Sequence, residues 1–123
     1  MSFKDYFGIQ ESALPKLATG FGGGIGLHGS LCGSLTGAII AIGMRSGRTN
    51  PKDRETALKV YEKCRQFMDR FEKEFGNKDC FSLTGGYHLD NPEESKKWAA
   101  AGGREKCTDI VEKTAQMLCQ YIE

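Results

Sequence analysis

The segment between Asn50 and Gly76 constrains the fold most, because it carries a helical pattern from a start signal to a stop signal. Apolar residues recur along it at three- and four-residue spacing, the period of one helix face. Asn50 is a capping residue, Pro51 suits a first helical turn, and Gly76 stands past the far end. We therefore predict a helix over residues 51–75 with the apolar stripe Ala57, Tyr61, Cys64, Met68, Phe71 and Phe75.

The rest of the chain also has helical patterns. We predict further helices over residues 11–19, 30–44, 92–101 and 104–121. No window alternates apolar and polar residues as a half-buried strand does, so we expect no strands. A glycine-rich stretch over residues 20–29 interrupts the helices, and residues 77–90 form a connection. The prediction is a single all-α domain over residues 1–123, a small bundle of about four to five helices with a glycine-rich loop.

The charges are nearly balanced, with 17 Lys and Arg against 16 Asp and Glu and a formal net charge of +1. Binding to phosphate backbones needs an excess of basic residues on one surface, so we expect no nucleic acid partner. The most apolar stretch, residues 35–44, is far shorter than the roughly 20 residues of a membrane span. Residues 1–7 show no signal-peptide pattern. We therefore expect a cytoplasmic protein with no membrane span.

Five cysteines are spread along the chain with no Cys-x-x-Cys pair among them. In a reducing cytoplasm a permanent disulfide framework is not expected, and the odd count leaves at least one thiol unpaired. Cys64 and Cys119 lie on or beside apolar helix faces, where cysteine packs as a small hydrophobe. Cys32 and Cys107 fall in the first turns of predicted helices, where the helix field favours thiolate, and Cys80 lies at a turn. These last three are the candidates for redox or metal chemistry.

The glycine-rich stretch allows three interpretations. Residues 24–29 formally match the dinucleotide fingerprint GxGxxG, but no strand leads into them, so a nucleotide site is the weakest of the three. A second interpretation is close packing, in which another backbone approaches a helix face that lacks side chains. The third adds a reactive or metal-binding Cys32 to this packing. The small face is formed by Gly29, Gly33, Gly37 and Ala41.

Four segments together resemble one known family. They are Phe21-Gly22-Gly23-Gly24-Ile25-Gly26, Cys32-Gly33-Ser34-Leu35-Thr36-Gly37-Ala38, Phe75-Gly76 followed by Cys80 and Leu83-Thr84-Gly85, and Lys106-Cys107. In order and spacing they are similar to the small redox-active proteins named for a C-GCAxxG-C-C pattern, and the resemblance covers nearly the whole chain. It implies a helical fold, redox activity and the capacity to hold an iron–sulfur cluster. It also implies motif glycines at Gly22, Gly23, Gly24, Gly33 and Gly37.

The chain departs from the family pattern in two places. Ser34 replaces the motif's alanine, a small-for-small change. The family has four cysteines, one of them within a CGAxxG motif, and its first cysteine would fall before Met1, so we expect that N-terminal segment to be lacking here. The matching cysteines are then Cys32, Cys80 and Cys107. A fourth ligand to a cluster would come from a partner subunit, from solvent, or from one of Cys64, Cys119, His28 and His88.

The leading hypothesis is a redox-active protein whose clustered thiolates bind an iron–sulfur cluster or another soft metal, or exchange with a disulfide. Its redox partner is unknown, and a homo-oligomer is a candidate assembly. No acid–base pair, nucleophile motif or substrate loop specifies a reaction, so the sequence leaves open whether the protein is an enzyme. The alternative is a structural or interaction module of a helical oligomer with no active redox site.

Overall fold

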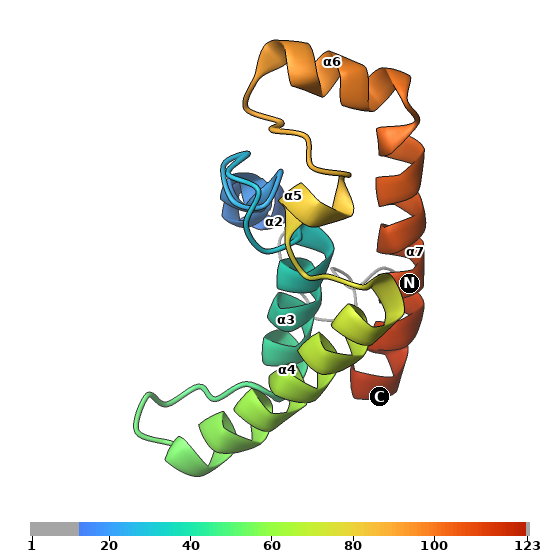
Figure 1. Ribbon diagram of the computed structural model, residues 1–123. Coiled ribbons are helices and arrows are strands. Elements are labelled where there is room, and N and C mark those ends of the chain that lie inside the picture. The colour runs from blue at the N-terminus through green and yellow to red at the C-terminus, as the bar shows by residue number, and fades with distance from the viewer. Residues whose placement is uncertain (1–12, 123) are drawn as a thin grey trace.

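The computed structural model describes residues 13–122, and the regular elements in this range are helices (Figure 1). They are α2 (Ala13–Ala18), the short 3₁₀ turn η1 (Thr19–Phe21), α3 (Gly33–Ser46), α4 (Arg54–Phe75), α5 (Cys80–Leu83), α6 (Pro92–Ala100) and α7 (Gly103–Ile122). Extended pairing in this range is limited to one antiparallel bridge between Leu31 and Asp79. The all-α prediction is confirmed. The first part of the helix expected over residues 11–19 lies outside the described residues.

The start of α4 differs from the sequence prediction. Asp53 is the N-cap, and its carboxylate accepts a hydrogen bond from the Thr56 N–H at 3.1 Å. Asn50 instead closes a tight turn with the backbone two residues further on. Both residues are good caps, and the turn at Asn50 leaves the helix start to Asp53. Gly76 ends the helix in the left-handed conformation, as the pattern predicts.

Of two other helix starts, one differs from the prediction and one agrees with it. α3 begins later than predicted, so Cys32 is its N-cap and not a first-turn residue. α6 begins as predicted, with Pro92 first and the Asn91 side chain accepting hydrogen bonds from two backbone N–H groups. The short α5 was not expected, because four residues are too few to show a helical period.

The core forms where α3 packs against α4 and α7 (Figure 1). Leu35 and Ile42 of α3 and Phe67 and Phe71 of α4 are fully buried. The predicted stripe on α4 included Tyr61, which is 50% exposed, and omitted Phe67. Tyr61 and Phe67 lie at opposite edges of the apolar stripe of α4. Helices α3 and α7 cover the edge with Phe67 and leave Tyr61 exposed. Within residues 13–122 no helix has the length and apolar character to cross a membrane.

The glycine-rich loop has an unusual left-handed backbone. Five consecutive residues, 23–27, have positive φ, and two of them are not glycine: Ile25 at 68° and Leu27 at 62°. A left-handed conformation costs a non-glycine residue about 1–2 kcal/mol. Each backbone N–H of residues 25–30 donates to a carbonyl of residues 20–25, which holds the loop in place. These amides are therefore not free to bind phosphate, which removes the basis for a nucleotide site here.

Of the predicted small face, Gly29 is closely approached, since a Cβ there would lie 3.0 Å from the Phe81 Cβ, whereas the two glycines within α3 are not. A Cβ on Gly37 would meet no atom within 4 Å, and one on Gly33 would meet only the Phe21 carbonyl at 3.5 Å. The tight contact occurs instead in the loop, where a Cβ on Gly24 would lie 2.6 Å from the Cys80 Cβ. The glycine loop, and not the helix face, is thus the part that packs closely.

Candidate cysteine site

Two short segments far apart in sequence, residues 30–32 and 78–80, pair through their backbones. The Cys32 N–H donates to a carbonyl of the second segment at 2.9 Å, and the Cys80 N–H donates to a carbonyl of the first at 2.6 Å. These bonds form part of the antiparallel bridge described above. The backbone itself therefore fixes the two cysteines on neighbouring segments, at the start of α3 and the start of α5.

Cys32, Cys80 and Cys107 line one cavity with a volume of about 280 Å³. They come from three different elements, since Cys107 lies early in α7. Most of the remaining wall is apolar and includes Leu83, Leu89, Trp98, Ile110 and Val111. The volume is well above the ~150 Å³ of an apolar cavity that accepts a benzene molecule. The structure thus brings the three candidate cysteines of the sequence analysis to one space.

Glycine at position 24 is what lets the loop lie directly on the cysteine site. Gly24 has φ +72°, and a Cβ there would lie 2.7 Å from the Ser30 backbone in addition to its collision with Cys80. Gly23 and Gly33 also line the cavity. Two of the motif glycines, Gly22 and Gly37, have no such steric reason, because a Cβ on either would meet nothing closer than 3.8 Å.

Burial and the neighbouring thiols keep two of the cysteines protonated. Burial, together with the nearby Cys32 and Cys107 thiols, raises the pKa of Cys80 from 9.0 to about 11. Burial also raises the pKa of Cys107, with a smaller contribution from Cys32. The helix start was expected to favour thiolate at Cys107, but its pKa moves the opposite way because burial disfavours the charged form. Mutual repulsion among the thiolates acts in the same direction.

The two remaining cysteines differ from each other. Cys64 is half-buried against the core, as predicted, and burial raises its pKa. Cys119 is exposed, and its thiol donates to the Ala115 carbonyl at 3.4 Å, so the packing predicted for it is wrong. The apolar face of α7 includes Leu118, and the next residue, Cys119, lies outside that face and is exposed to solvent. Neither Cys64 nor Cys119 lines the cysteine cavity.

The two histidines also lie outside the cavity wall. His28 is exposed on the glycine loop. His88 is exposed too, and its Nδ1 lies 3.2 Å from a carboxylate oxygen of Glu94. Of the residues expected as a fourth ligand, namely Cys64, Cys119, His28 and His88, none is brought to the three cysteines.

The donor chemistry of the cavity fits a soft metal, whereas the spacing of the donors requires adjustment. Thiolates are the ligands of iron–sulfur clusters, zinc and copper(I). Across residues 13–122, however, no group of three or more Cys, His, Asp or Glu side chains is close enough to hold a metal ion as it stands. Binding a single ion would therefore require the thiols to rotate or shift toward one another.

Comparison with known proteins identifies the family. A family model described as “Putative redox-active protein (C_GCAxxG_C_C)” matches residues 1–121. The chain belongs to the C_GCAxxG_C_C family. A protein of Archaeoglobus fulgidus whose printed name is “Uncharacterized protein” is 30% identical over 112 residues, which cover 85% of this chain and 67% of that protein. No solved structure matches.

In this C_GCAxxG_C_C protein the cavity wall contains two residues that the sequence did not single out for function. Thr84, which follows α5, and Trp98 of α6 both line the space beside the cysteines. Thr84 lies in the family segment Leu83-Thr84-Gly85, which assigned it no role, and the lone tryptophan sits in a helix with no fully buried residue. Local patterns predict the helix that carries Trp98, but not how α5 and α6 pack beside α7 to bring both residues to the site.

Proposed function

We propose that this protein is a redox protein that uses the thiolates of Cys32, Cys80 and Cys107 to bind an iron–sulfur cluster or another soft metal in their shared cavity. The observation that carries the proposal is the convergence of three cysteines, from three separate elements, on one largely apolar space. A cluster held there would supply one-electron transfer. The apolar wall would limit solvent access, which is one of the factors that set the potential of a metal centre.

The ionisation of the thiols favours metal binding over disulfide exchange. The thiolate is the nucleophile in exchange, and with a pKa of about 11 only about one Cys80 in ten thousand is ionised at pH 7. A bound cation reverses this, because its positive charge stabilises the thiolates that it contacts. Buried, protonated thiols are therefore poor nucleophiles and remain competent metal ligands, with proton release on binding.

The fourth ligand of a bound metal or cluster would not be one of the four side chains expected from the sequence. Residues 1–12 contain no cysteine or histidine, and the candidates of the sequence analysis lie away from the cavity wall. Solvent, a partner subunit or a substrate atom would complete the site. An open position is the arrangement that catalytic metal sites use, so a catalytic role is compatible with three protein ligands.

The thiols would adjust by rotation of their side chains. The backbone at Cys80 is held by the pairing of residues 78–80 with residues 30–32, so the segment itself stays in place. We expect the Cys80 thiol to turn toward Cys32 and Cys107 when a metal or cluster binds.

The test is anaerobic reconstitution with ferrous iron and sulfide, followed by assays of iron and acid-labile sulfide and by visible absorption. Alanine variants of Cys32, Cys80 and Cys107 are compared with Cys64→Ala and Cys119→Ala, which remove thiols outside the cavity. We expect the wild-type protein and the two controls to load and the first three variants to lose most of the absorption. A parallel titration with Co²⁺ reports simple metal binding through thiolate-to-metal charge-transfer bands.

Two results would contradict the proposal. One is a wild-type protein that stays colourless and metal-free after reconstitution and shows no Co²⁺ bands. The other is equal loading of all five variants, which would mean adventitious binding. Either result would favour the alternative, an interaction module without an active redox site.

A further inference from the structure

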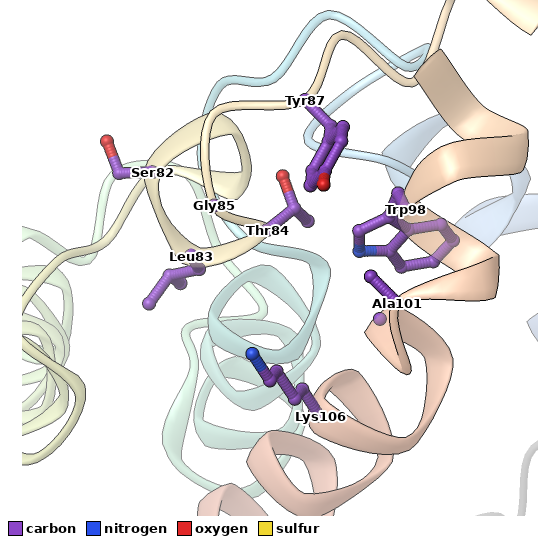
Figure 2. A pocket seen from close by; sticks show the side chains of 9 residues that line it. Ser82, Leu83, Thr84, Gly85, Tyr87, Trp98, Ala101 and Lys106 are labelled. Atoms are coloured by element: carbon purple, nitrogen blue, oxygen red, sulfur yellow. The ribbon is translucent and has the colours of Figure 1, made fainter. Parts of the chain in front are cut away.

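A second cavity lies beside the cysteine cavity and has a different chemical character. Its volume is about 210 Å³, and its polar lining residues are Ser82, Thr84, Tyr87 and Lys106. Figure 2 shows the hydroxyl of Tyr87 directed toward Thr84 and Trp98, whereas that of Ser82 points away from this space. Among the described residues that line it, none is Asp or Glu. The one charged group at this cavity is therefore positive.

The indole of Trp98 supplies a hydrogen-bond donor that has no use within the fold. Trp98 Nε1 is buried and has no hydrogen-bond partner in the described range, residues 13–122. An unpaired buried donor costs about 1–3 kcal/mol, so an acceptor placed against it is stabilised. The residue belongs to the walls of both cavities.

The direction of this N–H follows from the position of Gly103. A Cβ on Gly103 would lie 2.1 Å, 2.3 Å and 2.4 Å from the Trp98 atoms Nε1, Cε2 and Cδ1. Such similar distances place Gly103 over the face of the ring, so the N–H, which lies in the ring plane, does not point at it. Figure 2 shows the nitrogen edge of the indole facing the space beside Thr84, into which Lys106 also extends.

The surrounding groups favour an anion. The start of α7, a helix of 20 residues, forms part of the wall at Gly103 and adds the positive field of a helix N-terminus. The hydroxyl of Tyr87 can donate as well as accept. Lys106 provides the formal charge, and Trp98 Nε1 provides a donor with a fixed position.

We propose that this cavity binds a small anion with oxygen acceptors, a carboxylate or an inorganic oxyanion, through a hydrogen bond from Trp98 Nε1 and the charge of Lys106. The volume accommodates a molecule of a few heavy atoms, by comparison with the ~150 Å³ cavity that takes benzene. Leu83, Thr84 and Trp98 separate the bound anion from the cysteines. If the cysteine site is redox-active, as proposed above, this cavity would hold a small carboxylate or oxyanion beside it. Binding of the anion does not depend on that activity.

The chain offers a direct probe, because Trp98 is its single tryptophan. One indole N–H signal in a ¹H–¹⁵N spectrum, and the intrinsic fluorescence, report on Trp98 and the two cavities that it lines, and the Lys106 variant below assigns the effect to this one. The full-length protein is titrated with acetate and, separately, with phosphate, with ionic strength held constant by sodium chloride. Acetamide serves as the neutral counterpart of acetate. We expect a saturable shift of the indole signal with acetate, phosphate or both, and none with acetamide; the two titrations distinguish a carboxylate from an inorganic oxyanion.

Matched variants locate the effect. Lys106→Gln should weaken binding about tenfold or more, since a hydrogen bond or contact to a charged group is worth about 1.5–3 kcal/mol. Lys113→Gln, a change at another exposed lysine of the same helix, should leave the affinity unchanged. Gly103→Ala should abolish the shift, because the added methyl group displaces the indole.

An indole signal that does not move, or a drift that is linear and equal in Lys106→Gln and wild type, would overturn the proposal. The titration uses no metal and no redox reaction. Failure of cluster reconstitution together with a saturable acetate shift would therefore count against the proposed function alone, and the reverse outcome against the anion site alone.

Discussion

The protonated thiol of Cys80 should make the stability of the metal-free protein fall at alkaline pH. Its pKa is about 11 in the folded protein and 9.0 in the absence of burial, so between these values the folded state keeps a proton that the unfolded state has lost. Stability is then complete below pH 9 and declines by about 1.4 kcal/mol per pH unit up to pH 11. The total loss is about 3 kcal/mol, a large part of the 5–15 kcal/mol typical of a small domain.

The measurement is urea unfolding at several pH values from 8 to 11, with reductant and a metal chelator present throughout. Wild type is compared with Cys80→Ala, because the lysines and tyrosines that titrate in this range are common to both and cancel in the difference. We expect the unfolding free energy of wild type to fall more steeply, by up to about 3 kcal/mol over this range.

A control is needed for the loss of stability that any core substitution brings. Ala57→Gly in α4 keeps every thiol and lowers stability by about 1 kcal/mol through helix propensity, and its pH dependence should run parallel to wild type. A pH dependence of Cys80→Ala that also runs parallel to wild type would refute this prediction, because Cys80 would then have the same pKa in the folded and unfolded states.

Three further predictions concern local features. In thermal unfolding, Gly24→Ala should destabilise the protein much more than Gly26→Ala. Both glycines have left-handed φ, but only at position 24 does the new Cβ collide with other atoms. Equal destabilisation by the two substitutions would contradict this prediction. Asn91→Ala should cost about 1 kcal/mol through the lost cap of α6, seen as faster hydrogen exchange in that helix. In native alkylation followed by mass spectrometry, exposed Cys119 should react well before buried Cys80, and the reverse order would show that the cysteine cavity is open to solvent.

The parts of the fold that depend on local chemistry could be predicted. The Asn91 cap with proline after it and the glycine at position 76 are signals complete within a few residues, and both helix ends are found where the sequence places them. Competing local signals could not be ranked. Asn50 and Asp53 are equally good caps, and Asp53 begins the helix because Asn50 is used in the preceding turn.

The site was only partly predictable, for a related reason. Cys32, Cys80 and Cys107 could be selected because each stands near a glycine, a turn or a helix start, but their convergence depends on backbone pairing between distant segments. Burial at Cys107 depends on tertiary packing, so its effect on ionisation could not be read from position in the helix. Trp98 lies on a helix that the sequence predicts, but its place at the site depends on how that helix packs beside α7.

The bridge between Leu31 and Asp79 has a consequence for the order in which the molecule forms. It closes a chain loop that contains all of α3 and α4, and closing a loop costs more conformational entropy as its length grows. Packing of α3 against α4 reduces the length of flexible chain between Leu31 and Asp79, and so lowers the entropy cost of closing the bridge. The helical pair should therefore assemble first and the bridge should follow. Cys32 and Cys80 therefore meet late in folding, and a nascent chain keeps its thiols apart until the helices that will enclose them are in place.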